Sequence, residues 1–180
     1  MLILINKETL DHISEYEFRQ LNPNIFYPVI ITDESIIDSG YALLYSDIAK
    51  PTPSLYQKLV SASAQVIAGK YQEIWIVEDM TSDEILAVDA RIQRDIINTT
   101  QCRLDAFAQS RGYDGIMSAC TYSDSSIPAF STEGKYAVVA RDTTWAALYT
   151  LLAEVEAGVK PKPTGYADVE AILPILTWPV

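Results

Sequence analysis

The chain has 180 residues, of which 49% are hydrophobic and 21% charged, a balance typical of soluble globular proteins with one domain or two small ones. Its 24 acidic and 13 basic residues give a formal net charge of -11, which disfavours nucleic acid and anionic membranes as partners. Two cysteines, Cys102 and Cys120, are too few for a disulfide framework, and no apolar run is long enough to cross a membrane. We therefore expect a protein made in a reducing cytosol, without a nucleic-acid or membrane partner.

The first 80 residues predict a small mixed α/β domain. Ser14 and Glu17 have the spacing of a capping box, in which each side chain binds the backbone amide of the other residue. This pattern predicts a short helix that ends before Pro23, because proline cannot continue the hydrogen-bond ladder. Short apolar runs predict strands at residues 2–5, 29–32 and 41–45.

A β-hairpin is predicted where two β-favouring segments, 64–68 and 71–77, flank Gly69 and Lys70. Gly69 suits the first position of a two-residue turn because it tolerates positive φ. Apolar residues occur on both faces of the second strand, so we expect this strand to be covered, at least in part, on both sides.

The sequence period changes from that of strands to that of helices at residue 81. Thr81 or Ser82 can cap a helix, and the acidic residues Asp83 and Glu84 in its first turn favour the helix dipole. No glycine or proline follows until Gly112, so the predicted helix is on the order of 40 Å long. The small β domain alone cannot cover such a helix, and we expect it to pack on the rest of the chain or on another subunit.

Two further helices are predicted, a short one at residues 116–122 and a long one from about residue 130 to 157. Gly158 and the prolines that follow it end the long helix. One face of this helix carries apolar residues at helical spacing, namely Trp145, Leu148, Leu152 and Val155.

The last twenty residues contain four prolines and predict an extended tail that lies against a surface. Trp178, near the end of this tail, has two alternative roles: it docks on its own chain, or it anchors a partner as an interface hot spot. The predicted fold class is therefore α+β, with a small α/β domain at residues 1–80, a helical domain of three helices at 81–160 and a C-terminal tail at 161–180.

The sequence contains no motif for catalysis, metal binding or cofactor binding. His12 is the only histidine and lies in a polar segment, where a solvated side chain is the expected state. Cys102 and Cys120 fall on predicted helices, where a thiol usually serves as a small apolar filler. Carboxylate pairs such as Asp83 and Glu84 are explained by helix capping. We therefore expect no enzyme, no metal and no cofactor.

Two tryptophans, Trp75 on a predicted strand and Trp145 on the third helix, are expected to be core residues because tryptophan buries a large area. A carbohydrate-binding module is the remaining alternative for the N-terminal sheet. That function requires exposed aromatic rings, and Trp75 is the ring that it would use.

The C-terminal half, from about residue 84 to 180, resembles a family of phage tail proteins of mostly unassigned function that are often encoded beside tail fibre genes. The motifs that carry the resemblance are Arg103-Leu104-Asp105-Ala106-Phe107-Ala108, Arg111-Gly112-Tyr113-Asp114, Ser118-Ala119-Cys120-Thr121-Tyr122, Ala140-Arg141-Asp142, Trp145-Ala146-Ala147-Leu148 and Gly165-Tyr166-Ala167-Asp168. The last residues, from Leu173-Pro174 to Trp178-Pro179, are also similar to the C-terminus of tail fibre assembly chaperones.

The resemblance implies a chaperone that binds a trimeric tail fibre protein in the host cytoplasm and assists its folding or trimerisation. The alternative is a structural adaptor that stays on the fibre or baseplate of the virion tail, and a homo-oligomer remains open in either case. The expected partner-binding residues lie in the tail: Trp178, Pro179, Tyr166 and Leu176. The resemblance brings no catalytic residues.

Overall fold

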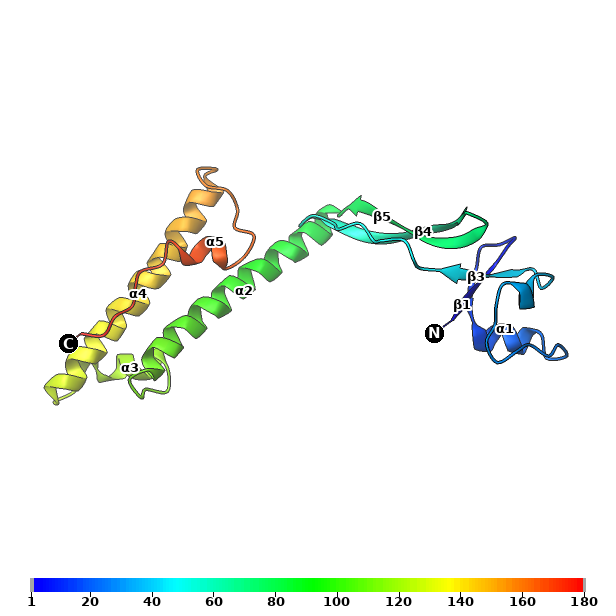
Figure 1. Cartoon of the computed structure of the whole chain (residues 1–180). Coiled ribbons are helices and arrows are strands. Elements are labelled where there is room, and N and C mark those ends of the chain that lie inside the picture. Colours follow the sequence, from blue (N-terminus) through cyan, green and yellow to red (C-terminus); the bar gives the residue numbers. More distant parts are fainter. Residues whose placement is uncertain (1, 180) are drawn as a thin grey trace. The chain divides into compact units, whose positions relative to one another are not determined.

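The computed structural model describes residues 2–179 and has an α+β fold, as predicted. The chain divides into two compact units, with the boundary between Thr81 and Ser82. The first unit contains a five-stranded sheet and the second contains the long helices (Figure 1).

The sheet of the first unit has the strand order β2-β1-β3-β5-β4. Only the β3–β5 pairing is parallel, and the other neighbours are antiparallel. The predicted strands at residues 2–5 and 41–45 are confirmed, each within one residue. The five strands are β1 (Ile3–Asn6), β2 (His12–Ser14), β3 (Tyr41–Tyr45), β4 (Gln57–Ile67) and β5 (Lys70–Asp79).

The short helix α1 (Glu15–Leu21) begins with the predicted capping box. The Ser14 hydroxyl accepts from the amide of Glu17, and the Glu17 carboxylate accepts from the amide of Ser14. The helix points the fully buried ring of Phe18 into the core, where it meets the rings of Tyr27 and Tyr41 at centroid distances of 4.9 and 5.3 Å. This aromatic contact holds α1 and the loop after it against the sheet.

The predicted hairpin is confirmed as β4 and β5, which are longer than the sequence pattern indicated. Ile67 pairs with Lys70, so the two turn residues are Ala68 and Gly69 rather than Gly69 and Lys70. Both have positive φ, 50° and 79°, as the mirror-image turn that matches strand twist requires. Gly69 therefore occupies the second turn position, and Ala68 adopts the left-handed conformation at the first.

The predicted strand at residues 29–32 is wrong. Residues 29–30 form a bend, and the carbonyls of Tyr27, Pro28 and Val29 accept hydrogen bonds from the Arg19 guanidinium instead of from a neighbouring strand. This β-favouring segment is therefore part of a loop, which is anchored by the buried side chains of Tyr27 and Ile31.

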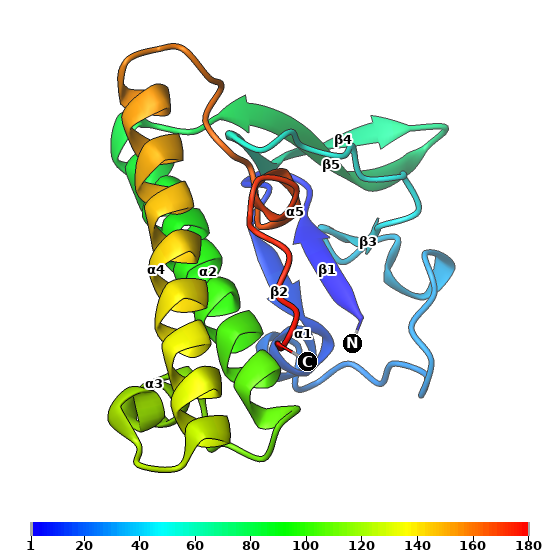
Figure 2. The ribbon, with the colours of Figure 1, turned by 90° about the vertical axis from the view of Figure 1, so that its left-hand side faces the viewer.

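The second unit contains two long antiparallel helices, α2 (Ser82–Gln109) and α4 (Pro128–Glu156), joined at one end by the short helix α3 (Ile116–Cys120) and a 3₁₀ turn at Thr121–Asp124 (Figures 1 and 2). These helices confirm the three predicted ones. The tail differs from the prediction, because it contains the short helix α5 (Ala167–Glu170) instead of being extended throughout. The reason is that one helical turn lets Val169 and Leu173 both bury against the long helices.

Gly134, a buried residue in the first half of α4, is the point where this helix packs closely against the 3₁₀ turn. A β-carbon at this position would come within 2.3 Å of the amide nitrogen of Ser123 and 2.4 Å of the carbonyl carbon of Tyr122. These atoms belong to the backbone, so they cannot rotate away as a side chain could. Gly134 is therefore required for the approach of the two segments.

Replacing Gly134 with alanine should destabilise the second unit by about 2 kcal/mol or more, because the added methyl group forces the backbone segments apart. Chemical denaturation measures this loss. The matched control is Gly165→Ala, since a β-carbon there meets nothing within 4 Å. Equal stability of the two variants would contradict the close packing at Gly134.

Candidate functional site

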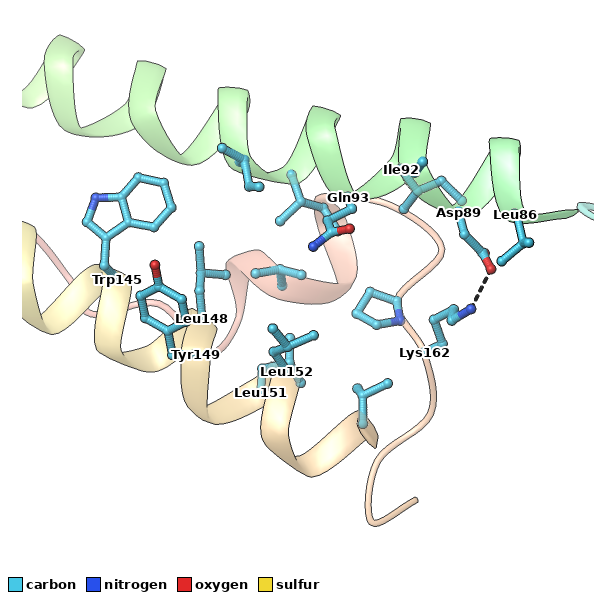
Figure 3. Close-up of a pocket in the computed structure, with 16 residues that line it drawn as sticks. Leu86, Asp89, Ile92, Gln93, Trp145, Leu148, Tyr149, Leu151, Leu152 and Lys162 are labelled. Carbon is cyan, nitrogen blue, oxygen red and sulfur yellow. Dashed lines mark hydrogen bonds and ion pairs between the residues drawn. The ribbon is translucent and has the colours of Figure 1, made fainter. Parts of the chain in front are cut away.

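An apolar groove with a volume of about 480 Å³ lies between α2 and α4 of the second unit (Figure 3). Its walls are mostly aliphatic and aromatic side chains. Leucine and isoleucine residues of α2 face Trp145 and a leucine-rich stretch of α4, and the C-terminal segment closes one side. The principal lining residues are Leu86, Ile92, Ile96, Ile97, Trp145, Leu148, Tyr149, Leu152 and Val155.

The groove exists because the C-terminal segment fills only part of the space between the two long helices. Val169 and Leu173 are buried there together with Leu151 of α4. Other side chains that line the groove are less covered: Tyr149 is 70% exposed, and Leu86 and Leu152 are exposed as well. Exposed apolar side chains that converge on one concave surface are typical of a binding site.

One ion pair crosses the mouth of the groove, between the ammonium of Lys162 and the carboxylate of Asp89 (Figure 3). Lys162 belongs to the segment after α4, so this contact ties that segment to α2. A pair of this exposure contributes little to stability, about 0–1 kcal/mol. Its effect is to position the backbone of residues 161–163 at the edge of the groove.

The predicted partner-binding residue Trp178 is docked on its own chain. Its ring stacks on the ring of Phe107 with a centroid distance of 4.3 Å and an interplanar angle of 11°. The indole N–H donates to the carbonyl of Phe107 at 3.2 Å and to the hydroxyl of Ser110 at 3.1 Å. Of the two alternatives for Trp178, the structure has the one in which the tail folds back.

The other three predicted residues also contact their own chain. Leu176 packs against the same core cluster as Trp178, and Tyr166 packs against the cluster around Val169. The carbonyl of Pro179 accepts from Arg111 at 3.4 Å. These residues hold the tail, and none of them lines the groove.

Two further hydrogen bonds hold the tail along the helices. The Arg103 guanidinium of α2 donates to the carbonyl of Pro174 at 2.6 Å, and the Thr177 amide donates to the hydroxyl of Tyr136 on α4 at 3.1 Å. The tail therefore contacts both long helices and is part of the folded unit.

The groove is not predicted from the sequence, although the apolar stripe of α4 that forms one of its walls is. All four residues of this stripe, Trp145, Leu148, Leu152 and Val155, line the groove. Trp145, which is predicted to be a core residue, is partly buried and also packs against the buried cluster around Leu104 and Ala137. The available signal is the breadth of the apolar face, since Tyr149 adjoins this stripe. When an apolar face is too wide for one neighbouring helix to cover, part of it stays exposed and is available to a ligand.

The histidine and the two cysteines differ in their exposure. His12 and Cys102 are exposed, while Cys120 is buried, which raises the pKa of its thiol. Among residues 2–179, no group of three histidine, cysteine or acidic side chains is placed to hold a metal ion. Across the same residues, no helix has the length and apolar character needed to cross a membrane.

Trp75 is half-buried on β5, and the ammonium of Lys50 lies 3.6 Å from its ring centroid. This position agrees only in part with the core role expected for it. A carbohydrate platform needs a ring face that is open to a sugar, and the cation occupies one face of this ring.

Comparisons with protein-family models, curated proteins and solved structures found no match for this chain.

Replacing Trp178 with alanine should destabilise the second unit by about 2–4 kcal/mol, because the stacking contact and the indole hydrogen bond are both lost. The matched control is Ile175→Ala, in the same tail, whose side chain is 85% exposed. If both variants have wild-type stability, the tail is not held by Trp178.

The phenol of Tyr113, which lies beside Trp178, should titrate late. Burial and then the hydrogen bond to Glu133 raise the pKa of Tyr113 to about 12 from an ordinary 10.0. Because the pKa is higher in the folded state, the protonated phenol stabilises the folded protein relative to the unfolded chain. This stabilisation is complete below pH 10 and is lost as the pH rises toward 12. An absorbance titration of the phenolates should show one late group fewer in Tyr113→Phe. An unchanged titration would contradict this placement of the hydroxyl.

Proposed function

We propose that this protein is a phage tail fibre assembly chaperone that acts by binding rather than by catalysis. The observation that carries the proposal is the open apolar groove between α2 and α4, in which Leu86, Tyr149 and Leu152 are exposed to solvent. A surface of this kind stabilises a bound apolar segment by removing both surfaces from water. The fibre protein is proposed as the client because of the motifs in the C-terminal half that resemble phage tail proteins.

A chaperone of this type would protect fibre subunits from aggregation while they fold. Trimeric fibres depend on contacts between distant parts of the sequence and between chains, so their subunits fold slowly and expose apolar surface while they do so. A groove that covers such a segment lowers the concentration of aggregation-prone intermediates until trimers form. The net charge of -11 keeps the chaperone and its complex apart from other copies.

A virion adaptor is the second candidate, and it is favoured by the division of the chain into two compact units. An adaptor joins two partners and remains attached, whereas a chaperone is released.

Co-expression with the neighbouring fibre gene, followed by mass spectrometry of purified virions, distinguishes the chaperone from the adaptor. The chaperone predicts fibre that is soluble only in the presence of this protein and virions that lack it. Fibre that is soluble alone, with this protein found in virions, would support the adaptor.

Replacing Leu152 with glutamate should weaken binding of the fibre protein by roughly tenfold or more, because a client segment would then have to cover a charge in an apolar groove. Calorimetric titration of the purified proteins measures the Kd. The matched control is Val139→Glu, which lies on the same helix, is also exposed and does not line the groove. Equal loss of binding in both variants would point to general charge repulsion and against the groove.

A further inference from the structure

The walls of the apolar groove offer few hydrogen-bond partners to a segment that enters it. Residues 86–97 lie inside α2 and residues 145–155 inside α4, so most of their backbone N–H and C=O groups are bonded within their own helix. Most of the lining side chains are apolar, and the charges of Asp89 and Lys162 are paired with each other. A bound segment therefore has to satisfy its own backbone groups or leave them in water.

The extended part of the C-terminal tail shows what an extended segment needs on these helices. The Arg103 guanidinium donates to the carbonyl of Pro174 at 2.6 Å, and the hydroxyl of Tyr136 accepts from the amide of Thr177 at 3.1 Å. Both helices thus supply side chains that bind the tail backbone. Neither Arg103 nor Tyr136 lines the groove, so an extended client would not find these partners there.

The part of the tail that borders the groove is helical. Its residue Val169 lines the groove from α5. Local hydrogen bonds satisfy the backbone here, because the amides of Val169 and Glu170 both donate to the carbonyl of Tyr166 at 2.9 Å, and the amide of Leu173 donates to Glu170 at 3.2 Å. Val169 and Leu173, four residues apart, are both buried against the long helices. The groove continues this surface, so a helix is the conformation that meets the same demand.

The dimensions of the groove set the length of the helix that fits it. Between residues 86 and 97, α2 rises by about 17 Å, which corresponds to a bound helix of about three turns. A second copy of this chain is a poor source of such a helix, because α1, α3 and α5 have only seven, five and four residues. Two concave grooves are also not complementary to each other, as a symmetric dimer interface requires.

We infer that the groove takes an amphipathic helix of about three turns from the fibre protein. This inference rests on the proposed function, because it names the part of the same client that occupies the groove. The client helix presents apolar residues at helical spacing to Leu86, Leu148 and Leu152, and its polar face to water. Its backbone groups are bonded within the helix, and the tail stays docked beside it.

The test first locates the bound segment by hydrogen exchange of the fibre protein, with and without the full-length protein. We expect a protected segment of about eleven residues with apolar residues at helical spacing. A synthetic peptide of this segment should gain helical circular dichroism when the full-length protein is added. Leu152→Glu should raise the Kd of the peptide by roughly tenfold or more, and the control Val139→Glu should not.

Proline substitution in the peptide distinguishes a helix from an extended segment. Proline at the centre should raise the Kd by roughly tenfold or more, because it removes a hydrogen bond and clashes with the preceding turn. The matched control is proline at the first helical position, which a helix tolerates.

Each failure has a different signature. A peptide that binds without gaining helix and tolerates the central proline would overturn the helical occupant and leave the proposed function standing. Fibre protein that does not bind at all, or that Leu152→Glu binds as tightly as wild type, would overturn both. Sedimentation of the free protein provides the remaining arm. A dimer that Leu152→Glu dissociates and Val139→Glu does not would place a second copy in the groove and reject the inference.

Discussion

The second unit depends on how the apolar faces of two long helices are covered. The helices α2 and α4 have 28 and 29 residues, and α3 with the 3₁₀ turn joins and packs them at one end. Toward the other end the cover comes from the C-terminal segment, through Val169 and Leu173. This segment is too small to fill the space, and the groove is the part that it leaves open. The same geometry therefore explains both why the tail is needed and why the groove stays open.

The tail has a stabilising function that limits its direct use in binding. Trp178 buries its ring on Phe107, and the tail backbone is bound by Arg103 and Tyr136. The hydroxyl of Tyr166 is buried without a hydrogen-bond partner among residues 2–179, which is a cost that docking must offset. A partner that binds beside the docked tail avoids breaking these contacts. The open groove is accordingly a better candidate for client binding than the tail itself.

Local signals in the sequence were sufficient for most of the elements. The capping box at Ser14, the hairpin around Gly69 and the uninterrupted stretch before Gly112 all act within a few residues, so the sequence predicts their structures. The bend at residues 29–30 is not predicted because it depends on hydrogen bonds from the Arg19 side chain, eight to ten residues earlier, which no local strand pattern reveals. The groove was missed for a similar reason. Apolar periodicity shows that Leu152 lies on an apolar face, but only the packing of distant segments decides which part of that face stays open.

In the proposed complex, a client segment occupies the groove while the tail stays docked. Hydrogen exchange of the full-length protein, with and without saturating fibre protein, tests this most directly. We expect slower exchange on binding in residues 86–97 of α2 and 145–155 of α4, with unchanged exchange around Trp178. Unchanged exchange along both helices, or faster exchange around Trp178 as the tail is displaced, would contradict it.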